Sequence, residues 1–286
     1  MLASTVHLKR NIIGSLATIQ DVEAIIITAG SLEDAKAAQT FVSGRKSTSP
    51  VKLFTTVGVH PTNALAFFQE PSKDVSDHVA ALQETLQAGT KAGAVVAVGE
   101  LGLDYDRLSY CPMKEQKIGF EAQLVLAERS NLPLFLHSRA SGADMYTMLE
   151  ANRHRFKDGV VHSFDGTASD LEGLLSLNLF IGINGCSLRT EENLDVVKAI
   201  PLERLMLETD APWCEIRPTH ASAKHVQTQK PMAKKPDKFV WGTGVKGRCE
   251  PWMVAQVCEA VAAVKGVDPA AVARHAHFNT RRVFGL

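Results

Sequence analysis

The sequence lacks the features that would place it in a membrane, on the secretory route or among disulfide-bonded proteins. It has no run of eighteen apolar residues and no basic segment followed by an apolar one near its start. We therefore expect no transmembrane helix, no membrane partner and no secretory signal. The five cysteines are odd in number, and none belongs to a Cys-x-x-Cys pair. This usage is typical of reduced thiols and predicts a location in the nucleus or the cytoplasm.

The sequence also lacks a net charge. It has 31 basic and 31 acidic residues, so the formal net charge at pH 7 is zero. No overall electrostatic field would draw the protein to nucleic acid or to an anionic membrane. Its length of 286 residues and its hydrophobic content of 45% suffice for one large core. We therefore expect a single domain spanning residues 1–286, with no organic cofactor and a monomeric state.

What the sequence contains is a repeated pattern of apolar runs that end in polar side chains. Each of these side chains can bind a metal ion or transfer a proton, and they are His60, Glu100, His137, His162 and Asp210. In a barrel of alternating strands and helices, the active site lies at the carboxyl ends of the parallel strands. The pattern therefore predicts an α/β fold, a TIM-type (β/α) barrel.

Seven of the eight strands of such a barrel are identifiable, and they lie near residues 25, 54, 96, 134, 160, 180 and 206. Residues 6–19 have apolar side chains at helical spacing, so we expect the chain to open in a helix and to lack the first strand. The open edges left beside the missing strand would lower stability and favour aggregation. Helices are predicted over 75–92, 113–131, 141–155, 170–177, 191–199 and twice after 251.

Four of the strand-end residues form a candidate metal site. Glu100 and Asp210 supply carboxylate oxygens, and His137 and His162 supply imidazole nitrogens. No short metal-binding motif such as His-Glu-x-x-His is present, so the prediction depends on the repeated position at strand ends. Together the four could hold one or two divalent ions and leave coordination positions open for water and substrate.

Three further residues have more than one interpretation each. His60 is a metal ligand, a donor to phosphate or a plain turn residue before Pro61. Asp104 either contacts substrate or caps the following helix, and the same choice applies to Asp106. All three follow predicted strand ends.

Glu208, Arg139 and Ser163 also have two interpretations each. Glu208 shares a strand face with Asp210, so it either orients a ligand or water, as part of the catalytic set, or forms an inward ion pair. Arg139 and Ser163 come just after two proposed ligands, where they could bind a phosphate or lie in solvent.

Residues 217–248 form a long basic segment without a clear strand or helix pattern. Its one acidic residue is Asp237. Its basic residues are Arg217, Lys224, Lys230, Lys234, Lys235, Lys238, Lys246 and Arg248. A loop of this length in a compact domain is often functional. We expect it to bind phosphates, with Lys234 and Lys235 as substrate contacts, or to be a solvated surface.

Five ordered tracts resemble the TatD family of metal-dependent deoxyribonucleases. They are Gly58–Pro61, Gly99–Asp104, Leu136–Arg139, Val161–Gly166 and Glu208–Trp213. The resemblance extends from Ala24 to Phe284 and is greatest to the eukaryotic branch, which also has tracts similar to Leu103–Leu108 and Ile183–Leu188. It implies a TIM barrel of the amidohydrolase type that cuts DNA with a divalent metal, in many members from the 3′ end.

The resemblance also implies roles for individual residues. Glu100 would contact two ions, His137 and His162 would hold the second, and Asp210 would hold the first and accept a proton from the attacking water. The family's first strand carries a His-x-His pair that this sequence lacks, and His7 falls in the predicted opening helix. The first ion would then depend on two carboxylates and water, which predicts unequal sites.

We therefore predict a hydrolase of DNA phosphodiester bonds with Mg²⁺ or Mn²⁺ at up to two sites, and Zn²⁺ as the alternative metal. Two other functions fit parts of the pattern. An amidohydrolase acting on a small cyclic amide would use the same ligand types, but it would not need the basic segment. A shortened, inactive form would only bind nucleic acid or other partners.

Overall fold

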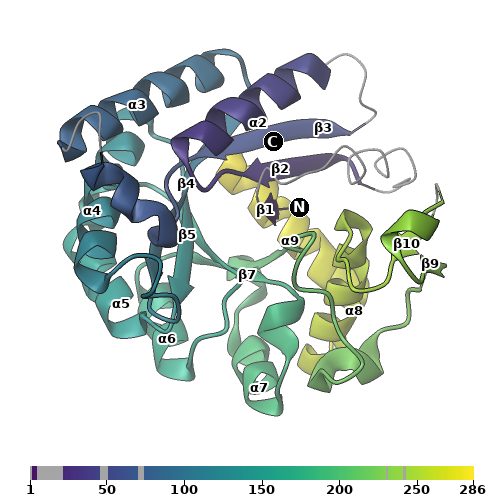
Figure 1. Cartoon of the computed structure of the whole chain (residues 1–286). Coiled ribbons are helices and arrows are strands. Elements are labelled where there is room, and N and C mark those ends of the chain that lie inside the picture. Colours follow the sequence, from purple (N-terminus) through teal and green to yellow (C-terminus); the bar gives the residue numbers. More distant parts are fainter. Residues whose placement is uncertain (1, 5–21, 46–50, 70–73, 230, 241–242) are drawn as a thin grey trace.

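The computed structural model describes residues 2–4, 22–45, 51–69, 74–229, 231–240 and 243–286. Eight parallel strands form one curled sheet in chain order (Figure 1). They are β1 (Leu2–Ser4), β2 (Ala24–Thr28), β3 (Lys52–Val57), β4 (Val95–Asp104), β5 (Leu134–Arg139), β6 (Gly159–His162), β7 (Phe180–Ile183) and β8 (Leu205–Leu207). Among these described strands, no ladder joins β8 back to β1. The predicted TIM-type fold is confirmed, and all eight carboxyl ends meet at one edge.

Helices alternate with the strands and surround the sheet (Figure 1). They are α2 (Leu32–Arg45), α3 (Val75–Lys91), α4 (Met113–Ser130), α5 (Gly142–Ala151), α6 (Ala168–Ser176), α7 (Glu191–Ala199), α8 (Val254–Lys265) and α9 (Pro269–Phe284). Side-chain capping explains where several of them begin. Thr167 forms a capping box at α6, and Thr190 forms one at α7. No helix in the described part of the chain is long and apolar enough to cross a bilayer.

The seven predicted strands are present as β2 to β8, but the prediction that no strand precedes Ala24 is wrong. Leu2–Ser4 form β1, which pairs in parallel register with β2. Three residues are too few to show a period of two, so the sequence pattern did not reveal this strand. The loss of stability expected from an unpaired β2 therefore has no structural basis. The predicted helix over 6–19, including His7, lies outside the described residues.

Strand β4 is longer than predicted, and this changes the surroundings of two carboxylates. The expected loop after Glu100 is still strand, which pairs with β5 as far as Asp104. Along this strand, Leu101 and Leu103 pack outward into the core beneath the helices. Alternation then turns Glu100 and Asp104 to the opposite face, inside the barrel.

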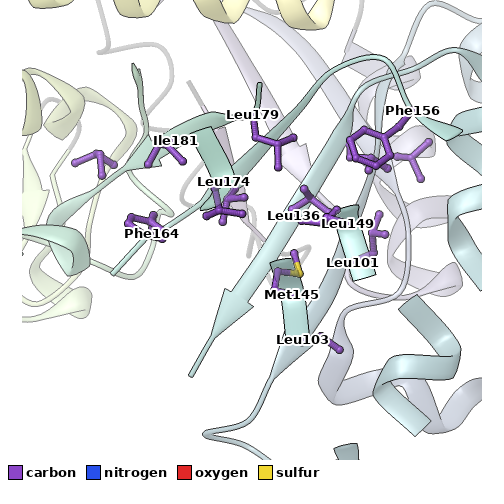
Figure 2. Close-up of a cluster of buried hydrophobic side chains, with 14 of the residues drawn as sticks. Leu101, Leu103, Leu136, Met145, Leu149, Phe156, Phe164, Leu174, Leu179 and Ile181 are labelled. Atoms are coloured by element: carbon purple, nitrogen blue, oxygen red, sulfur yellow. The ribbon is translucent and has the colours of Figure 1, made fainter. Parts of the chain in front are cut away.

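Two apolar layers lie on the two faces of the sheet. The outer layer packs strands β4, β5 and β7 against helices such as α5 and α6, as Figure 2 shows for Leu136, Met145 and Leu174. The inner layer closes the barrel below its carboxyl ends. Its members include residues from β2 and from each of β4 to β8, namely Ile26, Ala97, Phe135, Val160, Phe180 and Met206.

The basic segment after β8 is largely irregular, as predicted. It contains the short 3₁₀ helix η6 (Ala221–His225) and a two-stranded sheet of β9 (Met232–Ala233) and β10 (Gly244–Val245). Figure 1 places this small sheet at the outer edge of the molecule beside α8. Helices α8 and α9 confirm the two predicted after residue 251.

Candidate active site

The polar side chains of the site lie two positions further along their strands than the residues of the inner apolar layer. Side chains two apart on a strand share a face, so His137 follows Phe135, and His162 follows Val160. The rings of Phe135 and His162 stack with centroids 4.7 Å apart. On β7 the equivalent position is Gly182, where an added Cβ would lie 3.1 Å from the Cα of His162. The missing side chain leaves room for the polar groups from β6 and β8.

Glu100 is the residue around which the histidines gather. Its Oε1 lies 2.8 Å from Nδ1 of His137 and 2.7 Å from Nε2 of His162. Nε2 of His60 lies 3.5 Å from the same oxygen. One ligand atom from each of Glu100, His137 and His162 can be chosen so that all three lie within 4.8 Å of one another. A single cation could therefore contact the three predicted ligands together.

A second group shares one histidine with the first. His60, Asp104 and His137 also offer ligand atoms within 4.8 Å of one another. His137 contacts Glu100 through Nδ1 and Asp104 through Nε2, at 3.3 Å. Asp104 is fully buried, which suits a ligand and does not suit direct contact with DNA.

The charges of the first group stabilise one another. Burial raises the pKa of the Glu100 carboxyl, but the histidines around it outweigh that effect and hold the pKa well below its usual range. Burial lowers the pKa of His162, yet Glu100 and Glu208 overcome it and raise the pKa well above the usual value. The pKa of His137 is raised as well, because hydrogen bonds to Asp104 and Glu100 outweigh burial. Without a metal ion, this arrangement favours a negative carboxylate beside protonated imidazole.

The pKa of His60 shifts in the opposite direction from the pKa values of His137 and His162. Burial and the neighbouring charge of His137 lower its pKa to about 3, against the weaker opposing effect of Glu100. Its Nδ1 accepts a hydrogen bond from the backbone N–H of Thr62, which begins the 3₁₀ helix η2 (Pro61–Phe68). The ring is therefore neutral at pH 7, the form that binds metal ions.

Glu208 lies under His162 and is completely buried. Its Oε1 accepts hydrogen bonds from the backbone N–H of Ser163 and from Nδ2 of Asn184, and lies 3.6 Å from Nδ1 of His162. Glu208 therefore contacts the ring of the proposed ligand His162 from inside the barrel, and both of its interpretations stay predictions. Ser163 contributes its backbone at a positive φ of 49°. Asn184 was not predicted as a site residue, although its position directly after β7 matches the other strand-end residues.

Asp210 lies three residues beyond the end of β8, on a turn. Its φ is 52°, and the N–H of Trp213 donates to its carbonyl at 2.8 Å. Within the described residues Asp210 belongs to neither of the two ligand groups. Its Oδ2 instead lies 3.5 Å from the sulfur of Cys214.

An orphaned oxygen indicates that the centre suits a cation. Among the described residues, Oδ1 of Asp104, which belongs to the second ligand group, is buried and has no hydrogen-bond partner. A buried carboxylate oxygen without a partner is costly, and a bound cation would satisfy it. The donor set of imidazole and carboxylate is also the set that divalent transition metals prefer. The residues present therefore fit a divalent metal ion.

Arg139 lies beside the centre but is already paired. Its guanidinium contacts Asp165 and, at 3.1 Å through Nε, Asp106. These residues line a cavity of about 730 Å³ that is bordered by the starts of α5 and α6. The two acids neutralise much of the charge that was expected to bind phosphate. Sequence reasoning missed Asp165 because its partner lies on another strand end.

The basic segment is partly paired. Lys224 contacts Glu191 at 3.2 Å, and Arg248 contacts Glu250 at 2.7 Å. Lys234, Lys235 and Lys238 are exposed next to β9. Surface cations of this kind are available to a polyanion.

Comparisons with known proteins identify the family of the chain. The family model for TatD related DNase matches residues 7–285. The Deoxyribonuclease Tat-D of Schizosaccharomyces pombe is 43% identical over 257 residues, which is 89% of this chain and 80% of that protein. The 3′-5′ ssDNA/RNA exonuclease TatD of Erwinia tasmaniensis is 32% identical over 83% of this chain and 80% of its own length. The crystal structure of a TatD family hydrolase from Entamoeba histolytica superposes with a TM-score of 0.89 at 28% identity, over 99% of this chain and 97% of that one. The chain therefore belongs to the TatD related DNase family.

Proposed function

We propose that this chain is a divalent-metal-dependent deoxyribonuclease that removes nucleotides from the 3′ end of single-stranded DNA. The observation that carries the proposal is the convergence of Glu100, His137 and His162 at the carboxyl ends of the barrel strands. Family membership supports the reaction class. The direction is supported by the name of the Erwinia relative, a 3′-5′ exonuclease.

The ligand roles follow from the contacts described above. Glu100, His137 and His162 would hold one ion, and His60, Asp104 and His137 border a second position. A bound divalent ion would lower the pKa of a water ligand and neutralise charge that develops on the phosphate. Glu208 keeps the His162 ring oriented through Nδ1. We assign Asp210 as the acceptor of the water proton, because it lies at the same edge and carries a carboxylate.

The shared histidine makes the two positions unequal. Both groups contain two imidazoles and one carboxylate, but His137 belongs to both. An ion that takes this ring in one position weakens the other. Unequal binding was predicted from the missing strand; we now attribute it to His137. Mg²⁺ and Mn²⁺ remain the proposed metals, and the imidazole nitrogens favour Mn²⁺ of the two.

The surroundings of the centre suit a single strand. Trp213 is 61% exposed and Tyr110 is 66% exposed, and both lie in loops that follow the carboxyl ends of strands. Bases of single-stranded DNA stack on exposed aromatic side chains of this kind. The cavity beside Arg139 has the volume for a terminal nucleotide. Lys234 and Lys235 would contact phosphates further along the strand.

The alternative functions are less well supported. Barrel amidohydrolases commonly have a carboxylated lysine at a strand end that bridges two ions, and none of the described strands β1 to β8 ends in a lysine. The inactive form was inferred from a missing strand, and β1 is present.

A direct test uses metal-stripped protein and a 5′-labelled single strand. Added Mg²⁺ or Mn²⁺ should produce a ladder that shortens stepwise from the 3′ end, and a 3′-terminal phosphate should slow its appearance. Cleavage that proceeds fully in a chelator, or no cleavage with any of Mg²⁺, Mn²⁺ and Zn²⁺, would contradict the proposal. Hydrolysis of a cyclic amide in its place would support the amidohydrolase alternative.

A further inference from the structure

Two cysteines from different loops meet beside Asp210. Cys186 lies in the 3₁₀ helix η4 (Gly185–Leu188), which follows β7, and Cys214 lies in the turn after β8. Interaction with the Cys214 side chain lowers the pKa of the Cys186 thiol to about 7, so the two side chains are neighbours. Both are free thiols in the structure.

The backbones of the two loops touch directly beside this pair. A Cβ added to Gly185 would lie 2.2 Å from the carbonyl oxygen of Cys214 and 2.9 Å from the carbonyl carbon of Glu215. Only glycine permits such an approach, so the two loops are in direct backbone contact. A disulfide needs Cα atoms about 4.4–6.8 Å apart, and Cys186 directly follows the glycine that makes this backbone contact with Cys214.

The surroundings favour reaction at this pair over the other thiols. Nη2 of Arg189 donates to the sulfur of Cys186 at 3.0 Å, and a neighbouring cation favours the reactive thiolate. Cys214 is only partly buried, which gives small oxidants access. Cys186 is buried but still 8% exposed, against 0% for Cys111 and 2% for Cys249. Cys258 lies on α8 with its sulfur against the carbonyl of Pro269.

We propose that Cys186 and Cys214 form a reversible disulfide that responds to peroxides. The Cys186 thiolate attacks one peroxide oxygen, which breaks the O–O bond and gives a sulfenic acid and one water after proton uptake. The Cys214 sulfur then attacks the sulfenic sulfur, the S–S bond forms, and a second water leaves with the thiol proton. Two thiols lose two electrons, and one hydrogen peroxide becomes two waters. A dithiol reductant reverses the change by thiol–disulfide exchange.

The disulfide would act on the proposed active site through Asp210. The Cys214 sulfur lies 3.5 Å from Oδ2 of Asp210. Oxidation removes the thiol proton at this contact and turns the sulfur toward Cys186. This consequence rests on the proposed nuclease function, whereas formation of the bond does not. We expect the oxidised protein to lose DNA cleavage and to regain it after reduction.

The test follows the bond itself before activity. The full chain, free of metal, is treated with hydrogen peroxide, blocked at remaining thiols and digested without reduction for mass spectrometry. The expected result is a linked peptide pair joining Cys186 and Cys214, which dithiothreitol separates. Cys258→Ser should keep the link, and Cys186→Ser should remove it.

Two results would overturn the inference. The first is peroxide-treated protein in which Cys258 is oxidised but Cys186 and Cys214 are not joined. The second is loss of cleavage that occurs equally in Cys186→Ser and wild type. If the reduced chain cuts no DNA at all, the nuclease proposal fails, while the linked peptide still decides whether the disulfide forms.

Discussion

Glu208 is a single buried residue that supports the proposed metal ligand His162 and is not itself a proposed ligand. Its contacts to Ser163, Asn184 and His162 fix the imidazole above the inner apolar layer. We expect Glu208→Gln to weaken metal affinity or cleavage by about 10–100-fold, as is typical when a partner of a ligating histidine is lost. Metal titration and cleavage rates of the purified variant measure both quantities.

Glu121→Gln is the matched control, because Glu121 is exposed on α4. It should leave both quantities unchanged. A Glu208→Gln protein with normal metal affinity and normal cleavage would show that His162 does not need this partner.

His60 predicts how the stability of the metal-free protein depends on pH. Its folded pKa of about 3 lies below the ordinary value of 6.5. Between these values the unfolded chain binds a proton that the folded chain does not, so the free energy of unfolding falls as the pH falls. His60→Asn, which keeps an acceptor for the N–H of Thr62, should flatten this dependence. Urea unfolding in a chelating buffer from pH 7 to pH 4 measures the slope.

The exposed His154 provides the control for that series. His154→Asn should retain the wild-type slope. The raised pKa values of His137 and His162 act in the opposite sense, since their stabilising charge is lost as the pH rises, and they remain in both variants. An unchanged slope in His60→Asn would mean that His60 is protonated in the folded protein.

The residues of the centre were predictable to different degrees. Glu100, His137 and His162 could be found because an apolar run ending in a ligand is visible in sequence. The environment of Asp104 could not, because it depends on where β4 ends, and the strand continues through residues that resemble a loop. The partners of Arg139 come from other strand ends, so only the fold brings them together.

At the scale of secondary-structure elements, the extension of β4 depends on Gly102. Its φ is 145°, and an added Cβ would lie 2.0 Å from the carbonyl oxygen of His137. We expect Gly102→Ala to lower the free energy of unfolding by about 1–3 kcal/mol or more, because it strains the backbone and presses on β5. Gly44→Ala in α2 is the control, since no atom lies within 4 Å of its Cβ position. It should be neutral or stabilising by about 0.4–1 kcal/mol. Equal stability of the two variants would contradict this account of β4.

The exposed lysines beside β9 test the basic segment. Replacing Lys234, Lys235 and Lys238 with glutamine should weaken binding to single-stranded DNA. It should also flatten the salt dependence by up to about 0.7 log units per lost phosphate contact. Fluorescence anisotropy at several salt concentrations gives the slope.

A triple variant of Lys52, Lys91 and Lys157 carries the same change in charge on the opposite face. These exposed residues lie at or just before the starts of β3, β4 and β6. This control should keep the wild-type slope. If both triple variants show the same loss of DNA affinity and the same change in salt dependence, the basic segment contributes only through the overall charge.

Elements were easier to predict than their ends. Long apolar runs and helical spacing located β2 to β8 and the helices between them. Strand β1 was missed because three residues give no pattern, and its assignment depends on pairing with β2. The ends of β4 and β5 were placed too early because polar residues at the barrel mouth resemble loop.

At the scale of the whole molecule, the sheet gathers side chains from strands far apart in sequence onto one edge. The inner apolar layer closes the barrel beneath them, so the polar centre opens only toward that edge. The fold class followed from the sequence, since alternating strands and helices of this number have few arrangements. Sharing of His137 between two ligand groups could not be predicted, because it depends on distances.

The central claim is that the ion held by Glu100, His137 and His162 carries out DNA cleavage. Titration of metal-stripped protein with Mn²⁺, with bound metal followed by electron paramagnetic resonance and cleavage rate measured in the same samples, tests it most directly. We expect the rate to rise in proportion to occupancy of the tighter site, and Glu100→Gln to abolish that site and the cleavage together while retaining the thermal transition. Cleavage without bound Mn²⁺, or a Glu100→Gln protein that cuts DNA at the normal rate, would contradict the account.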